Sequence, residues 1–184
     1  MSPSRTLLPA GVLAAALGMS SPAGAAVLPL PLDRLTDASD YVVRGVVSAL
    51  WVEEDLRGVH WTHAQVEVLD VYKGPSDLDA LEVTWMGGIL GTEGTFVPDA
   101  PVFDEQEPIL LFAEHLPAGI VSPTGLAQGK FTIRIDPDSG QEIAVRWKPP
   151  AHMPYDHRFV PLPPARERTP LTDLVTRVRQ EVAR

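Results

Sequence analysis

Hydrophobic and polar residues alternate with a period of two through most of this chain, which is the pattern of β-strands. The runs are rich in β-branched residues and are separated by segments of Gly, Pro, Asp and Ser that are typical of turns. The pattern predicts strands at Tyr41–Val52, about Val59–Tyr72, Leu81–Trp85, Ile109–Phe112, Phe131–Ile135 and Ile143–Trp147. The fourth is a continuous apolar run, as expected for a strand buried on both faces.

The second predicted strand contains a break in its alternation. Ala64, Val66 and Val68 place apolar side chains on one face, whereas Leu69 and Val71 place them on the other. A β-bulge produces such a slip, and bulges allow long strands to coil into barrels. We therefore expect a mainly β fold, a small antiparallel barrel of the oligonucleotide/oligosaccharide-binding (OB) type, with a two-sheet β-sandwich as the alternative.

The C-terminal part of the chain has a different pattern. Residues 148–168 carry six prolines, and we expect a linker without regular structure there. From residue 169 onward the apolar residues recur at helical spacing, with Thr169 as the expected N-cap and Pro170 as the first helical residue. The expected organisation is a β-barrel domain at 26–147, a linker at 148–168 and a helix at 169–184 packed on the barrel. Its apolar stripe consists of Leu171, Leu174, Val175, Val178 and Val182.

The first 25 residues have the features of a signal peptide. Arg5 is the only charged residue among them, and it precedes a mainly apolar run from Leu7 to Met19. Small residues at Ala23-Gly24-Ala25 then form an A-x-A cleavage site. We therefore expect export to the periplasm or the extracellular space, cleavage after Ala25, and no stable membrane anchor afterwards.

Composition narrows the classes of function. Without the leader, 14 basic and 24 acidic side chains remain, so the surface repels phosphate backbones and nucleic-acid binding is not expected. The chain has no cysteine, which excludes disulfides, thiolate metal sites and cysteine nucleophiles. The core alone must therefore stabilise the exported protein.

Three stretches resemble a known family. Ser39–Gly45, Ala64–Pro75 and Leu126–Ile133 are similar to the netrin-like domain of tissue inhibitors of metalloproteinases. They resemble still more closely Cys-free exported bacterial proteins of unknown role. The resemblance spans roughly residues 37–135 and implies an OB-like barrel. The inhibitors bind the protease zinc through an N-terminal cysteine, which this chain lacks, so the resemblance implies no site residue.

No motif predicts a catalytic, metal or cofactor site. His60 and His63 are three residues apart on a predicted strand, where their side chains point to opposite faces. His152 and His157 lie in the proline-rich segment, where nothing in the sequence fixes their geometry. The sequence contains no H-E-x-x-H and no G-x-S-x-G pattern. We therefore predict no catalytic residues, no metal and no cofactor.

The segment 87–107 is the candidate binding region. It is longer than ordinary connections, and loops of this length are usually functional or disordered. Apolar residues among its glycines indicate order; they either tuck the loop over one barrel end or leave its backbone and acidic edge to a protein or peptide partner. The candidate binding residues are Gly87, Gly88, Gly91, Phe96, Phe103, Asp104, Glu105 and Glu107.

These observations support two classes of function. The first is an exported, non-enzymatic binding or interaction module, since long loops on a rigid scaffold commonly carry recognition. The alternative is an envelope hydrolase or metal-dependent enzyme with an unrecognised site. A cleft that joins His115, or His152 and His157, to acidic residues would favour that alternative.

Overall fold

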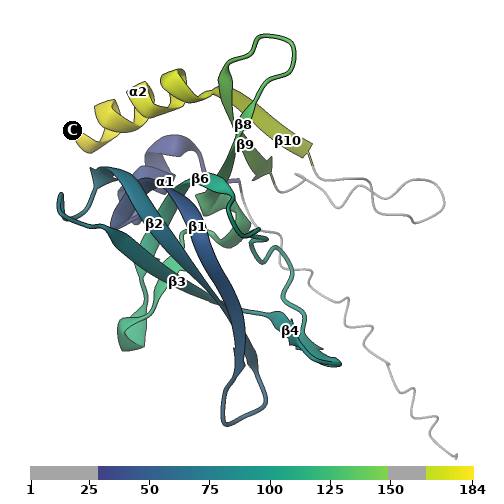
Figure 1. Cartoon of the computed structure of the whole chain (residues 1–184). Helices are drawn as coiled ribbons and strands as arrows, with labels where there is room; N and C mark the ends of the chain where they lie inside the picture. Colours follow the sequence, from purple (N-terminus) through teal and green to yellow (C-terminus); the bar gives the residue numbers. More distant parts are fainter. Residues whose placement is uncertain (1–28, 149–164) are drawn as a thin grey trace, which may run out of the picture.

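The computed structural model describes residues 29–148 and 165–184 (Figure 1). The predicted signal peptide at 1–25, most of the predicted linker, and His152 and His157 lie outside the described residues. The helical elements are α1 (Leu32–Ala38), η1 (Pro117–Gly119), η2 (Leu126–Gly129) and α2 (Leu171–Val182). The strands are β1 (Tyr41–Glu54), β2 (His60–Lys73), β3 (Ala80–Met86), β4 (Gly88–Leu90), β5 (Glu93–Thr95), β6 (Pro108–His115), β7 (Val121–Pro123), β8 (Lys130–Ile135), β9 (Glu142–Lys148) and β10 (Ala165–Pro170).

One curled antiparallel sheet forms most of the molecule. Its strand order is β10-β9-β8-β6-β1-β2-β3, and β7 pairs with β6 beside this path. Strands account for 50% of the described residues, and the sheet curls into a half-barrel. The second sheet consists only of β4 and β5, so the described residues form no two-sheet sandwich. The prediction of a mainly β, barrel-like fold with a C-terminal helix is confirmed.

Strand β6 separates two hydrophobic clusters. Leu110 and Phe112 belong to the cluster that α1 and α2 cover, together with Leu35, Phe131 and Leu174. The intervening Ile109, Leu111 and Ala113 belong to the cluster that β1, β2 and β3 enclose. All five of these β6 side chains are buried, as the continuous apolar run predicts.

The predicted bulge in the second strand is present. In the β1–β2 register Arg44 pairs with Asp70 and Gly45 pairs with Val68, so Leu69 has no partner across the ladder. Leu69 is exposed, whereas Val71 packs on the same cluster as Val68, so the extra residue returns the later part of β2 to its inward phase.

Glycine is required at position 45, where the two bulged strands lie close together. A Cβ on Gly45 would lie 2.4 Å from the carbonyl oxygen of Glu67, which is far closer than van der Waals contact allows. The close approach of the two backbones therefore depends on this residue.

The structure corrects the expected C-terminal boundaries. The linker was expected to lack regular structure to residue 168, yet β10 pairs with β9 from Ala165 to Pro170. All six prolines of the segment precede residue 165, so the backbone N–H groups of 165–169 are free to pair. Helix α2 begins at Leu171 and Pro170 occupies its N-cap position, one residue later than expected.

Strand β9 is buried on both faces near its start. Ile143, on the face that the alternation predicts, is buried, but so are Ala144 and Arg146 of the opposite face, while Val145 and Trp147 are half-buried. No helix in the described residues is both long and apolar enough to span a membrane.

Candidate functional site

The segment 87–107 begins as a small hairpin, β4–β5, that projects from the end of the half-barrel (Figure 1). Its first residues are fixed to β2. The Gly87 N–H donates to the His60 carbonyl at 2.9 Å, and the Thr62 hydroxyl donates to the Gly87 carbonyl at 2.5 Å. Gly88 has φ 143°, and a Cβ there would lie 2.6 Å from the Thr62 hydroxyl. The hairpin therefore leaves β3 in a direction that only glycine permits.

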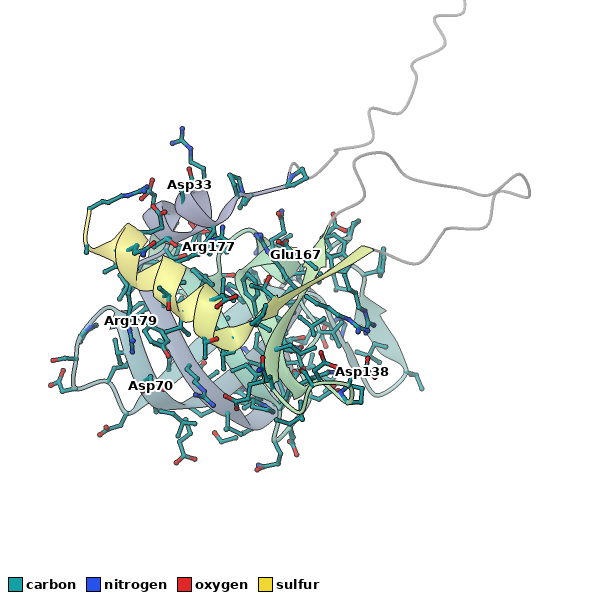
Figure 2. The ribbon with its side chains drawn as sticks, turned by 90° about the horizontal axis from the view of Figure 1, so that it is seen from above. Asp33, Asp70, Asp138, Glu167, Arg177 and Arg179 are labelled. Atoms are coloured by element: carbon teal, nitrogen blue, oxygen red, sulfur yellow. The ribbon has the colours of Figure 1, made fainter. Side chains whose placement is uncertain are left out.

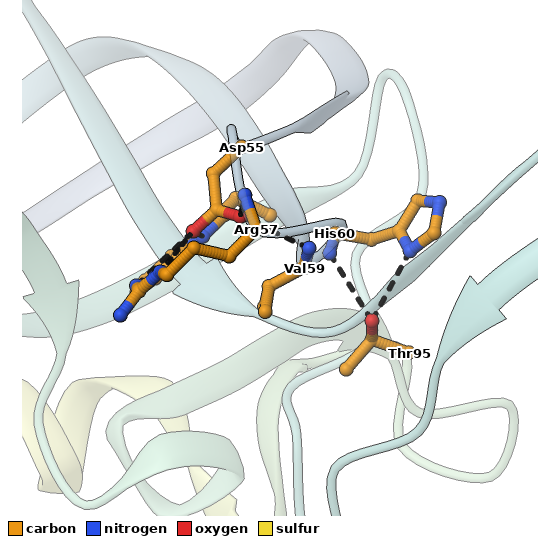
Figure 3. A network of polar contacts seen from close by, with 6 residues as sticks. Asp55, Arg57, Val59, His60 and Thr95 are labelled. Carbon is orange, nitrogen blue, oxygen red and sulfur yellow. Dashed lines mark hydrogen bonds and ion pairs between the residues drawn. The ribbon is translucent and has the colours of Figure 1, made fainter.

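A polar network holds the far end of the hairpin to the β1–β2 turn (Figure 3). The Thr95 hydroxyl accepts the backbone N–H of His60 at 3.1 Å and also hydrogen-bonds Nδ1 of the same residue at 3.1 Å. In the turn itself, Asp55 Oδ1 accepts the backbone N–H groups of Val59, at 3.0 Å, and Arg57, at 2.8 Å. These two hydrogen bonds are the main reason that the pKa of Asp55 falls to about 2.

The second half of the segment is anchored in the core. Phe103 is buried and stacks on Trp85 with ring centroids 4.9 Å apart. The Lys130 ammonium also lies over the Phe103 ring, 4.8 Å from its centroid. Phe103 therefore anchors the second half of the segment to the core.

A buried ion pair fixes the end of the segment. Lys130 Nζ lies 2.5 Å from Glu107 Oε2 and also donates to the carbonyl of Val102. The other carboxylate oxygen accepts the Thr132 hydroxyl at 2.7 Å, and the Asp104 N–H donates to Oε2 at 3.2 Å. Both ionic side chains are more than nine-tenths buried. Burial lowers the pKa of Lys130, and the hydrogen bond and charge of Glu107 oppose that shift.

A largely apolar groove lies between this segment and the ends of β1 and β3. Its volume is about 870 Å³, within the range of small-molecule and peptide pockets. Trp51, Val52 and Trp85 contribute to the wall on the sheet side. The wall on the segment side carries apolar side chains that are largely in water, namely Ile89 (76% exposed), Phe96 (88%) and Val102 (75%).

The structure brings together four of the eight candidate residues. Gly87, Gly88, Phe96 and Phe103 line the groove. The remaining four lie outside it. Gly91 is in the turn between β4 and β5, Glu105 is exposed, and Asp104 and the buried Glu107 both line a neighbouring cavity.

The expected acidic edge is therefore split. Glu107 pairs with Lys130 and is largely buried, whereas Glu105 is exposed. Of the apolar residues expected to anchor the segment, Phe103 does so, while Ile89 and Phe96 remain exposed. The tucked arrangement therefore holds for Phe103, and Ile89 and Phe96 leave apolar surface in water.

Sequence reasoning missed the groove wall contributed by β1 and β2. Leu50, Trp51, Val52 and Thr62 line the groove from these strands. The run Leu50-Trp51-Val52 contained a signal, because three consecutive large apolar residues at the end of an alternating strand indicate cover on both faces.

The histidines occupy separate surroundings, as predicted for His60 and His63. His60 is buried against Thr95, whereas His63 stacks on Trp51 at 5.0 Å and its Nδ1 lies 3.0 Å from Glu82. His115 ends β6 on the surface, where its N–H donates to Asp40. Within residues 29–148 and 165–184, no three histidine or carboxylate side chains are grouped so as to hold a metal ion.

Comparison with known proteins identified no relative of this chain. No family model, no curated protein and no solved structure matches the chain.

Proposed function

We propose that this protein is an exported, non-enzymatic binding module of the bacterial envelope or extracellular space, and that its groove holds an apolar segment of a protein or peptide partner. The groove between the segment 87–107 and the sheet carries the proposal. It offers about 870 Å³ beside large apolar side chains that are left in water. Exposed apolar surface of this kind, gathered at a concave site, is typical of interaction surfaces.

The way in which the segment is held supports binding without large rearrangement. Hydrogen bonds at Gly87 and Thr95 fix the two ends of the hairpin, and Phe103 and Glu107 fix the rest of the segment. A recognition surface that is ordered before binding loses less conformational entropy when its partner arrives. The exposed side chains of Ile89 and Phe96 therefore belong to a segment whose backbone is already held in place.

The remaining parts of the proposal rest on the sequence. The leader with its A-x-A site supports export, and the acidic mature chain argues against nucleic acid as the partner. The netrin-like resemblance of residues 37–135 is in keeping with a single curled antiparallel sheet. Binding residues are often carried on loops that a rigid scaffold positions.

Panning of a random peptide library on the chain from Ala26 onward tests this function. We expect enrichment of peptides rich in apolar residues, and loss of their binding in the Phe96→Ser and Ile89→Ser variants. Both side chains are largely exposed, so their removal leaves the core intact. Ile135→Ser is the matched control, because Ile135 is 63% exposed on β8 and does not line the groove.

Point substitutions are preferable to deletion of the segment. Phe103 and Glu107 belong to the core, so removing residues 87–107 would destabilise the fold and confuse lost binding with unfolding. Equal binding of the enriched peptides by Phe96→Ser, Ile89→Ser and the control would contradict the proposal, as would the absence of any enrichment.

A further inference from the structure

A separate cavity lies against the hydrophobic cluster that α1 and α2 cover. Residues 29–32, the strands β8, β9 and β10, and helix α2 enclose about 460 Å³, and none of the residues lining this space lines the groove. Leu30, Leu32, Phe131 and Leu174 give it apolar walls. It is large enough for a small organic molecule.

Arg146 of β9 borders this cavity and has unmet hydrogen-bonding capacity. Its side chain lies over the Phe131 ring, 5.1 Å from the centroid, and its Nε donates to the Gln128 carbonyl at 2.9 Å. The residue is only 7% exposed, and Nη2 is buried without a hydrogen-bond partner in the described residues. Native proteins rarely leave a buried donor unpaired, least of all on a charged group.

The neighbouring charges do not satisfy Arg146. Glu167 stands directly opposite in the β9–β10 register, but it is exposed, and no ion pair within 4 Å joins it to Arg146 in the part of the chain described. Arg177 of α2 also lines the cavity, and Figure 2 labels it on the side of the helix nearest α1. The charged residues lining the cavity are thus two arginines and one carboxylate. In a chain with a net charge of −9, this is a locally cationic site.

These features together define the chemistry of a ligand. A guanidinium group recognises a carboxylate through paired N–H donors, and Arg146 is a largely buried guanidinium that borders this cavity. The apolar walls require an apolar body next to that charged group. We propose that this cavity binds a small organic carboxylate with an aliphatic body, its carboxylate at Arg146 and its aliphatic part against Leu30 and Leu174.

Isothermal titration calorimetry with octanoate tests the proposal on the chain from Ala26 onward. We expect saturable binding of octanoate, and much weaker binding of both octanol and inorganic phosphate, because each has only one of the two required features. Arg146→Gln should weaken octanoate binding about tenfold or more, as expected for loss of a charge-assisted hydrogen bond. Arg134→Gln is the matched control, since Arg134 is an exposed arginine on β8 that does not line this cavity.

A second variant keeps the test decisive if Arg146→Gln fails to fold. Arg177 is exposed on α2, so Arg177→Glu leaves the core unchanged while reversing a charge at the cavity. We expect it to weaken octanoate binding by several-fold and to leave the melting temperature nearly unchanged. Octanol binding as tight as octanoate binding, phosphate binding as tight as octanoate binding, or no effect of Arg177→Glu would each overturn the proposal.

Discussion

At the scale of single residues, the ion pair between Lys130 and Glu107 links the segment 87–107 to the sheet. Each of the two charged groups loses most of its hydration in the core, and hydrogen bonds from Thr132 and Asp104 complete the shell of the carboxylate. Such a pair adds little net stability compared with a well-packed apolar pair, but breaking it leaves an uncompensated buried charge.

Removing one partner of this pair should therefore cost more than removing both. We expect Lys130→Met to lower the free energy of unfolding by about 3–5 kcal/mol, and the double variant Lys130→Met/Glu107→Leu to recover much of that loss. Urea unfolding followed by circular dichroism measures both values. A single variant within about 1 kcal/mol of the wild type would show that Glu107 remains well solvated.

The hydrogen bonds of Asp55 should make the stability of the β1–β2 turn depend on pH. Hydrogen bonds from the Val59 and Arg57 N–H groups lower the pKa of its carboxyl from 3.8 to about 2. The stabilisation that they give is complete above about pH 4 and is lost as the pH falls through 2, because the protonated group no longer accepts both bonds well. NMR titration of the Asp55 carboxyl carbon should give a midpoint near 2, and Asp55→Asn should remove this pH dependence. A midpoint near 3.8 would contradict the geometry of the turn.

The roles of individual polar residues were the least predictable from the sequence. Lys130 and Arg146 lie in alternating strands, where a charged residue normally marks the solvent face, yet both are buried. Their partners, Glu107 and the Gln128 carbonyl, lie 18 residues or more away along the chain. A period-two pattern carries no information about such contacts, because only the tertiary fold brings these groups together.

At the scale of elements, a helix or strand could be predicted when its own residues carried the signal, and could not when the signal came from a partner strand. The bulge in β2 is visible in the phase of its own apolar residues, and the buried β6 in its own continuous run. The sequence did not predict strand β10, because its stretch Arg-Glu-Arg-Thr has no alternation of apolar and polar residues. These residues form a strand because their backbone pairs with β9. The hairpin β4–β5 was missed because its three-residue strands are too short to show a period.

Helix α2 is stabilised by its apolar face, which gives a direct test of its packing. Leu174 is 2% exposed among residues of the first cluster, so Leu174→Asp would bury an unpaired charge. We expect it to lower the free energy of unfolding by roughly several kcal/mol. Val182→Asp is the matched control because Val182 is 38% exposed on the same helix. Equal melting temperatures for the two variants would indicate that the helix does not close the core.

At the scale of the whole molecule, export should remove the N-terminal residues, so the exported protein is shorter than the full sequence. If residues 1–25 are a signal peptide, the protein recovered from the periplasm or the medium begins at Ala26. N-terminal sequencing of that protein checks the cleavage site, and Ala25→Arg should abolish cleavage there. Recovery of an exported chain that still begins at Met1 would disprove the processing scheme.

Fold class could be predicted at this scale, but closure of the barrel could not. Strand number, strand length and the bulge all indicated a curled antiparallel sheet, and this is what the structure shows. Whether the outer strands meet depends on register and on what covers each open edge. Those properties belong to pairs of strands far apart in sequence, such as β6 with β1, and no single stretch encodes them.

The two faces of β6 also govern the order in which the molecule can assemble. A nascent chain that ends before residue 109 contains β1, β2 and β3, but it lacks the strand whose alternate side chains complete both clusters. Once β6 pairs with β1, the two clusters share a wall, and loosening one side of that wall disturbs the other. Both halves should therefore gain protection from hydrogen exchange in a single step and lose it together.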